Sequence, residues 1–364
     1  MHITLQTEEF KEALELVGRV STKHVTLPVL QCVLIEVKNG KGVLKATNLE
    51  IGIEVPIAVS IEEEGVVAVP ATTLIQTITL HSSKEVTLRL EEETLIVEGK
   101  DSTTQIKSIP SEEFPSIPRL ETARQTLQGQ LFAHGLKTVA FAASQSSIKP
   151  ELGSVYIAQK KEHTLTFVAT DSFRLMEKTV VQKGLILEEP LLIPYKNAQE
   201  LQRILESNKS DPELQVNDNQ CALTFPNGVY VTSRLTAGSF PDYVQIIPKE
   251  YVTHSTILKH DLLHSLKKTN IFLNKFFQIS MIVTSDSLTI SANSGEVGTT
   301  TESIAATTTG EELTLSFNQR YLYEPLQYLN EESIILHFAG VGRPLVVETV
   351  HDKSIRYLVM PMNK

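Results

Sequence analysis

The sequence predicts an α+β protein made of three tandem repeats of one domain, each with two helices packed on antiparallel sheets. Ala46-Thr47-Asn48, Ala169-Thr170-Asp171 and Ser291-Ala292-Asn293 each close a β-rich run, at intervals of 123 and 122 residues in a chain of 364. A repeat of this length corresponds to a whole domain and not to one turn of a solenoid.

The domain boundaries follow from this interval. We expect domains over residues 1–120, 121–250 and 251–364. The segments 118–125 and 248–253 are polar and flanked by proline, as linkers between domains often are.

The first helix of each repeat is predicted from apolar residues spaced i, i+3, i+4, i+7. This spacing starts at Phe10 and indicates a helix over 8–20. It returns 122 residues later, starting at Phe132, for a helix over 130–144, and in a weaker form over 259–269.

The second helix of each repeat is expected over 71–80, 197–208 and 318–330. The first two follow Pro70 and Pro194, and proline is tolerated near a helix start because that amide has no helical acceptor. Pro325 lies inside the third pattern and should kink or shorten that helix.

Short alternating runs around these helices predict strands. The predicted strands cover 33–38, 43–47, 51–59, 85–90, 94–98, 104–109, 164–169, 175–181, 334–338, 345–350 and 355–360. Antiparallel sheets of this kind bury one face under the helices, and each repeat has edge strands that are left to pair.

The composition is typical of a multi-domain protein with ample core, because 41% of the residues are apolar and 21% are charged. No apolar run approaches the roughly 18 residues of a membrane span, and the acidic N-terminus does not resemble a signal peptide. We therefore expect a cytoplasmic protein with no membrane association. Cys32 and Cys221 lie in strand-like contexts and fit buried small side chains better than a disulfide or a metal site.

The net charge of −10 argues against a simple nucleic-acid-binding protein. The six predicted helices sum to zero, so the rest of the chain carries the whole negative charge. Basic residues stand at helix ends or in neighbouring loops, namely Lys23, His24, Lys149, Lys196 and Lys275. Acidic segments outside the helices, such as Glu62-Glu63-Glu64 and Glu91-Glu92-Glu93, also fit a simpler explanation, which is solubility.

An enzyme is one alternative function. His163 with Asp171, His351 with Asp352, and Asp286 near Glu296 are pairs that could begin an active site, but none has a nucleophile or metal-ligand spacing beside it. The phosphate-loop, zinc-protease and nucleophile-elbow motifs are all missing. We expect no catalytic residues, no metal and no cofactor. A second alternative, an acidic adhesion array of β-rich domains, would call for a secretion signal.

Seven motifs in a fixed order carry a resemblance to a known family. They are Thr26-Leu27-Pro28-Val29-Leu30, Thr47-Asn48-Leu49-Glu50, Glu113-Phe114-Pro115, Ala169-Thr170-Asp171-Ser172-Phe173-Arg174-Leu175, Phe240-Pro241-Asp242-Tyr243 with Pro248-Lys249, Ser316-Phe317-Asn318, and Tyr357-Leu358-Val359-Met360-Pro361-Met362. On these motifs and the threefold repeat, the chain resembles the bacterial DNA sliding clamps, the β subunits of DNA polymerase III, over essentially its whole length.

The resemblance implies a non-catalytic processivity factor. Two chains would close head to tail into a homodimeric ring of six clamp domains around double-stranded DNA, which the ring holds without sequence specificity. Matching positions imply DNA contacts at His24, Lys149, Lys196 and Arg203. Arg203 also fits a solvated ion-pair face, because Glu200 and Glu206 are its helical neighbours.

The resemblance also implies a hydrophobic cleft for short peptides of the polymerase III α subunit, the clamp-loader δ subunit and other proteins with clamp-binding motifs. The matching positions are Leu152, Thr170, Ser172, Phe173, Arg174, Leu175, Pro241, Ile246, Pro344, Val359, Met360, Pro361 and Met362. Ser172-Phe173 stands where the family usually has Gly-His, which predicts a narrower and more apolar rim. Leu175, Val359 and Met360 also fit ordinary strand core.

Ring closure is expected to depend on apolar side chains of the first and third domains. Ile271 and Phe272 match the family's paired interface residues, and Ile106 matches a facing position. Apolar anchors near the centre of an interface usually carry most of its energy. Each of these side chains could instead belong to the core of one chain.

Overall fold

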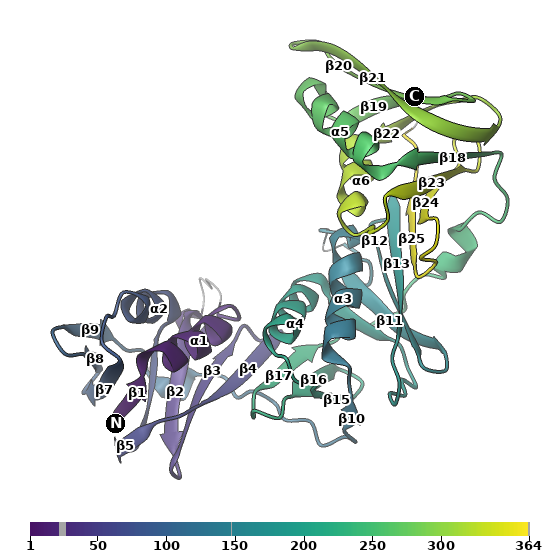
Figure 1. Ribbon diagram of the computed structural model, residues 1–364. Coiled ribbons are helices and arrows are strands. Elements are labelled where there is room, and N and C mark those ends of the chain that lie inside the picture. The colour runs from purple at the N-terminus through teal and green to yellow at the C-terminus, as the bar shows by residue number, and fades with distance from the viewer. Residues whose placement is uncertain (22–26, 147, 363–364) are drawn as a thin grey trace. The chain divides into compact units, whose positions relative to one another are not determined.

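The computed structural model describes residues 1–21, 27–146 and 148–362. The chain divides into two compact units (Figure 1). The first unit contains residues 1–133, 184–186 and 196–235, and the second contains the remainder. Each unit is therefore built from segments that are distant in sequence, and the two share the residues of the second predicted domain.

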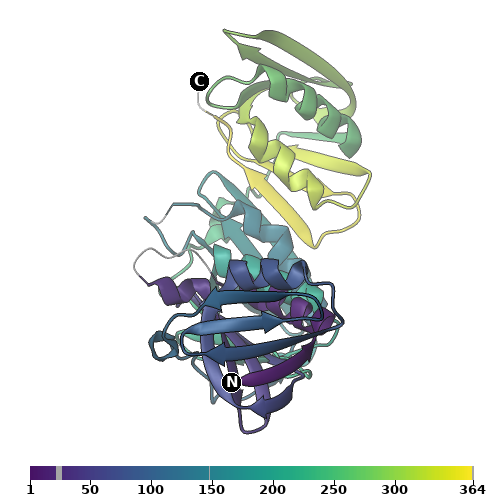
Figure 2. The same cartoon turned by 90° about the vertical axis from the view of Figure 1, so that its left-hand side faces the viewer.

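Two antiparallel sheets form the first unit. The five-stranded sheet, which faces the viewer in Figure 2, has the order β5-β1-β7-β8-β9. Its strands are β1 (His2–Gln6), β5 (Ser60–Glu63), β7 (Glu85–Glu91), β8 (Thr94–Glu98) and β9 (Thr103–Lys107). The eight-stranded sheet has the order β10-β15-β16-β17-β4-β3-β2-β6. Its strands are β10 (Gln125–Thr126), β15 (Glu213–Val216), β16 (Gln220–Thr224), β17 (Tyr230–Arg234), β4 (Ile51–Ile57), β3 (Lys41–Thr47), β2 (Cys32–Lys38) and β6 (Gly65–Pro70).

The helices of the first unit bury one apolar face each. α1 (Thr7–Gly18) packs on α2 (Ala71–Thr79) and covers β3 and β4. Phe10, Leu14 and Val17 of α1 are buried, as the i, i+4, i+7 spacing predicts. α4 (Tyr195–Ser207) in the same way buries Leu201, Ile204 and Leu205.

One continuous antiparallel sheet of twelve strands forms the second unit, in the order β14-β11-β12-β13-β25-β24-β23-β18-β21-β20-β19-β22. Its strands are β11 (Ser154–Lys161), β12 (Thr164–Thr170), β13 (Arg174–Val181), β14 (Leu191–Pro194), β18 (Thr253–Leu258), β19 (Gln278–Val283), β20 (Ser287–Ser294), β21 (Gly298–Gly310), β22 (Leu313–Asn318), β23 (Ser333–Phe338), β24 (Leu345–Thr349) and β25 (Ile355–Val359). The pairing of β13 with β25 joins the second and third repeats through backbone hydrogen bonds.

Helix α5 (Lys259–Thr269) packs on β18, β20 and β21 and against α6 (Gln319–Tyr323). Helix α3 (Gly129–Val139) contains the point at which the chain passes from the first unit, which includes Ala133, to the second, which includes His134. Gly135 of α3 is required by a close approach, because a Cβ there would lie 2.5 Å from the ring of Phe167. Short 3₁₀ turns complete the helical elements: η1 (Pro28–Gln31), η2 (Ser111–Glu113), η3 (Ala140–Ala142), η4 (Tyr243–Ile246), η5 (Asn270–Phe272) and η6 (Glu324–Gln327).

The helix predictions are confirmed in position, with two changes in length. The helix expected over 130–144 is α-helical only to Val139 and ends in η3. The helix expected over 318–330 ends at Tyr323, and Pro325 lies at the start of η6. The predicted shortening is thus confirmed, because proline has no amide hydrogen for the α-helical bond.

Cys32 and Cys221 are both buried free thiols, as predicted from their strand-like contexts. Burial raises the pKa of Cys32 to about 11 and that of Cys221 to about 12, so both thiols stay protonated. No helix in the described part of the chain is long and apolar enough to cross a membrane.

Candidate functional site

A tight turn between β12 and β13 organises the predicted cleft. The Thr170 hydroxyl donates to the carbonyl of Arg174 at 2.6 Å and accepts from the amide of Ser172 at 3.2 Å. Asp171 Oδ1 accepts from the amides of Phe173 and Arg174 at 2.9 and 3.0 Å. Ser172 has φ 77°, a left-handed conformation that glycine adopts at least cost.

The first repeat forms the same turn between β3 and β4. The Thr47 hydroxyl donates to the carbonyl of Ile51 at 3.0 Å, and Asn48 Oδ1 accepts from the amides of Glu50 and Ile51. Leu49 has φ 75°. The first two tripeptides of the sequence repeat therefore mark one hydrogen-bonded turn.

The third tripeptide does not form this turn. Ser291-Ala292-Asn293 lies within β20, and the strand continues to Ser294, which pairs with Gly298 of β21. The third repeat replaces the turn with a longer hairpin, so the expectation that this tripeptide closes its strand run is wrong by one residue.

Arg174 is the polar anchor of this region. Its guanidinium donates to Asp171 Oδ2 and to the carbonyl of Phe141, both at 2.9 Å, and contacts the Glu324 carboxylate. It also lies over the ring of Tyr321, 4.5 Å from the centroid. A buried guanidinium held in this way connects β13 to the helical turns α6 and η6 of the third repeat.

Three of the predicted cleft segments are joined by direct contacts. Leu175 and Leu358 belong to one buried cluster with Tyr243, and Met360 packs against it. The amide of Met360 donates to the carbonyl of Phe173 at 2.8 Å. The segments around residues 170–175, 240–247 and 357–360 therefore lie together in the second unit.

The cleft residues differ in exposure. Leu152, Thr170, Arg174, Leu175 and Val359 are buried, Pro344, Met360, Pro361 and Met362 are half-buried, and Ser172, Phe173, Pro241 and Ile246 are exposed. Phe173 is 61% exposed. Leu152 lies in the loop before β11. The amide of Met362 donates to the carbonyl of Ser316. These two cleft residues therefore lie outside the buried cluster of Leu175, Tyr243 and Leu358.

Tyr243 was not identified as a site residue from the sequence, although it lies within a motif. Its hydroxyl accepts from Lys160 Nζ at 2.7 Å and donates to the Glu177 carboxylate. Burial and this carboxylate raise the pKa of Tyr243 far above its usual value of 10.0, so the phenol stays protonated. The rings of Tyr156 and Phe240 stack beside it, with centroids 4.8 Å apart.

The predicted DNA-contacting residues lie on several elements. Lys196 is exposed in the first turn of α4, and Arg203 is exposed on the same helix, where it pairs with Glu200. Lys149 is exposed in the loop that follows η3. His24 lies outside the described residues.

Two further basic residues border a pocket of about 380 Å³ between α5 and α6. Lys267 is exposed, and the Arg320 guanidinium lies 3.6 Å from the ring centroid of Phe277. The sequence signal for this site was the charge of +2 on residues 259–269. The predicted DNA contacts did not include either residue.

The predicted interface residues are not alike. Ile271 is 66% exposed and Phe272 is half-buried beside the start of β21. Ile106 of β9 is only 4% exposed, because it packs inside the first unit. Among the predicted interface residues, the exposed apolar surface therefore comes from Ile271 of the third repeat and not from Ile106 of the first.

β9 and part of β21 are among the strands with a backbone edge that no other described strand covers. β9 pairs with β8 on one side. β21 is divided, since residues 306–310 pair with β18 and residues 298–305 pair with β20. Unpaired edges of this kind are the usual template for pairing with another chain.

The chain matches three family models, which together cover nearly all of it. They are described as the DNA polymerase III beta subunit N-terminal, central and C-terminal domains, and they match residues 1–118, 126–242 and 244–363. The exact domain boundaries that we expect from the sequence therefore remain predictions.

Similar proteins and structures extend over the full length. The beta sliding clamp of Synechococcus elongatus is 27% identical over 375 residues, covering 100% of this chain and 99% of that protein. That of Staphylococcus aureus is 26% identical over 378 residues, with the same coverage. The beta-subunit structure from Thermotoga maritima has a TM-score of 0.93 at 22% identity and covers 100% and 99% of the two chains. The sliding clamp structure from Bacillus subtilis has a TM-score of 0.91 at 24% identity, with the same coverage.

Proposed function

The chain belongs to the family of DNA polymerase III β subunits, the β sliding clamps, which makes it a non-catalytic processivity factor, and we propose that it acts as one half of a closed homodimeric ring around duplex DNA. The match of all three domains in order carries the family assignment. The ring, its contacts and its partners are the proposed part.

The open edges of β9 and of residues 298–305 of β21 support ring closure. β9 of one protomer and residues 298–305 of β21 of its partner would pair, and the second pair of edges would close the ring. Ile271 is exposed where such an interface needs an apolar anchor. Closure in this arrangement would pair the β9 edge and the β21 edge of both protomers.

The proposed hold on DNA is topological. Lys149, Lys196, Arg203, Lys267 and Arg320 would give weak attraction to phosphates. Contacts to phosphate carry no sequence information, so the ring can slide. Helix α1, with exposed Glu8, Glu9, Glu12 and Glu15, contributes repulsion and not attraction.

The proposed cleft receives short peptides from the polymerase III α subunit, the clamp-loader δ subunit and other proteins with clamp-binding motifs. Phe173, Ile246 and Met360 supply adaptable apolar surface, and the turn at Ser172 sets its rim. We propose that the protein works in the cytoplasm, where the replicating chromosome lies.

Retention on DNA tests the proposal. The full chain is loaded by a clamp loader onto nicked circular DNA, washed at high salt, and the DNA is then cut. Because only a closed ring survives the wash, we expect retention on circles and release after linearisation. Equal loss from circles and linear DNA in high salt would contradict topological binding.

A further inference from the structure

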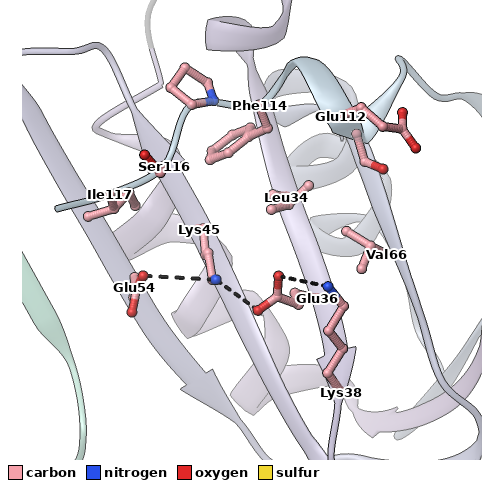
Figure 3. Close-up of a pocket in the computed structure, with 12 residues that line it drawn as sticks. Leu34, Glu36, Lys38, Lys45, Glu54, Val66, Glu112, Phe114, Ser116 and Ile117 are labelled. Atoms are coloured by element: carbon pink, nitrogen blue, oxygen red, sulfur yellow. Dashed lines mark hydrogen bonds and ion pairs between the residues drawn. The ribbon is translucent and has the colours of Figure 1, made fainter. Parts of the chain in front are cut away.

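A pocket of about 650 Å³ lies on the sheet of the first repeat, under the segment that follows β9 (Figure 3). Leu34, Val66 and Phe114 give it apolar walls. The ammonium of Lys45 lies between the carboxylates of Glu54 and Glu36 (Figure 3). None of the predicted DNA, peptide or interface residues lines this pocket.

The charged groups of the pocket form a short network of ion pairs. Lys45 Nζ lies 2.8 Å from Glu36 Oε1 and 3.9 Å from Glu54 Oε1. The side chain of Glu54 is only 9% exposed, and it also contacts Arg119. An ammonium and a buried carboxylate thus stand side by side in a pocket that Glu36, Lys38 and Glu112 also line.

The internal repeat identifies the corresponding place in the second repeat. Leu34 lies opposite Lys45 in β2–β3, as Tyr156 lies opposite Val168 in β11–β12. The interval of 123 residues that relates the two turns also relates Glu54 to Glu177.

The segment that follows β9 also has a counterpart in the second repeat. Phe114-Pro115 aligns with Phe240-Pro241, which sets Ile117 against Tyr243.

In the second repeat the place is filled by the chain's own tyrosine. Tyr243 is buried, packs with Val168, and its hydroxyl accepts from Lys160 and donates to Glu177. Phe240 meets its ring edge-on at 6.3 Å. This part of the molecule shows that a glutamate and a phenylalanine at these positions accommodate a tyrosine. Its lysine, Lys160, stands at the position of Lys38, whereas Lys45 stands at that of Val168.

In the first repeat no such tyrosine is supplied. Ile117 packs instead with Leu120 and Tyr230 and lies over Gly52. It is shorter than tyrosine and directed to that cluster, so the pocket beside Lys45 stays open.

We propose that this pocket binds a tyrosine side chain presented by a short exposed segment of a partner protein. The ring would lie against Phe114 and Leu34, and the hydroxyl would accept from Lys45 and donate to Glu54. A hydroxyl suits this pair because it is both donor and acceptor, whereas a ligand with a full charge of either sign would face a like charge. The remaining volume takes the residues that flank the tyrosine.

Two peptides test the proposal, acetyl-Gly-Tyr-Gly-amide and acetyl-Gly-Phe-Gly-amide. Each is titrated into the full chain with methyl-labelled leucine, valine and isoleucine, and binding is followed by NMR at Leu34, Val66 and Ile117. We expect saturable shifts with the tyrosine peptide and at least about tenfold weaker binding of the phenylalanine peptide, since the hydroxyl bonds to charged groups. Equal affinities, or no shift with either peptide, would overturn the proposal. Shifts that appear on raising the protein concentration alone would indicate a second copy of the chain as occupant and also overturn it.

Three variants complete the test. Ile117→Tyr supplies the phenol from within, as the second repeat does, and should abolish binding. Leu80→Tyr adds a tyrosine at a position that is 85% exposed on the same unit and should bind like the unmodified chain. Lys45→Met places an apolar side chain where the second repeat has Val168, so it should fold and lose the preference for tyrosine over phenylalanine. Undiminished binding by Ile117→Tyr, or an unchanged preference in Lys45→Met, refutes the assignment.

Discussion

Leu49 and Ser172 hold the same left-handed backbone conformation, with φ 75° and 77°, at positions 123 residues apart. Each lies one residue after the Asn48 or Asp171 side chain that accepts two amides of its turn. A side chain at such φ is strained. The repeat has therefore kept a turn whose hydrogen bonds offset the strain.

Glycine at this position should stabilise the protein. We expect Ser172→Gly to raise the free energy of unfolding by about 0.5–1 kcal/mol, because glycine adopts positive φ without a Cβ clash. Leu49→Gly should act in the same direction. Urea unfolding of both variants measures this, with Ser172→Ala as the matched control that keeps the Cβ. A gain in Ser172→Ala equal to that in Ser172→Gly would show that strain is not the cause.

Removal of the Arg174 side chain should be costly. Arg174→Ala leaves Asp171 and Glu324 without their partner and the Phe141 carbonyl without its donor, so we expect a loss of about 3 kcal/mol in the free energy of unfolding. Arg343→Ala, at an exposed position of the same unit, should change it by less than about 0.5 kcal/mol. Similar losses in the two variants would argue against a structural anchor at Arg174.

Phe173 should contribute to peptide affinity in the proposed cleft. Because its ring is 61% exposed at the rim, Phe173→Ala should leave the fold intact and weaken binding of a clamp-binding peptide by about tenfold. Fluorescence anisotropy with a labelled peptide measures the affinity. Val181→Ala, at the exposed end of β13, is the control and should bind normally.

Ile271 and Ile106 should respond differently to substitution. Ile271→Glu places a charge in the proposed interface and should convert dimers to monomers in sedimentation experiments without lowering the melting temperature. Ile186→Glu, at a position that is 67% exposed, is the control and should remain dimeric. Ile106→Ala should instead lower the free energy of unfolding by about 2–4 kcal/mol, because its side chain is buried in one protomer. A monomeric Ile271→Glu that is also unfolded would leave the interface without support.

His337 should make the stability depend on pH. Burial lowers its pKa below the ordinary 6.5, against the opposing attraction of Glu348, while His254, Arg356 and Lys353 lower it further. The unfolded state therefore binds the proton first as the pH falls below about 6.5. Stability should be full above that pH and decline as the pH falls toward the folded-state pKa. His337→Gln should flatten this part of the unfolding profile, and an unchanged slope between pH 7 and 5 would contradict the assignment.

Local patterns were sufficient for much of the architecture. The apolar spacing located α5 at residues 259–269 and Pro325 shortened α6, because both depend on neighbours within one or two turns of helix. The repeated tripeptides predicted equivalent strand ends, and two of them form the same turn, since its bonds all lie within five residues.

The cleft was harder to predict from the residues alone. The motif around Arg174 located its turn, but the contacts of Arg174 with Phe141 and Glu324 join residues 33 and 150 positions away. Tyr243 likewise meets Glu177 and Lys160 only because the turn η4 packs on strands that are distant in sequence.

The amino-acid order alone determines the repeat, the helices, the turns and the family, because each depends on short-range spacing or on motifs in sequence. The tertiary structure decided which residues at equivalent or similar positions became buried and which stayed exposed. It buried Ile106 and left Ile271 exposed, and it filled one pocket with Tyr243 while Ile117 left its counterpart open. Burial and cross-strand contact depend on packing between distant segments, and no local pattern encodes them.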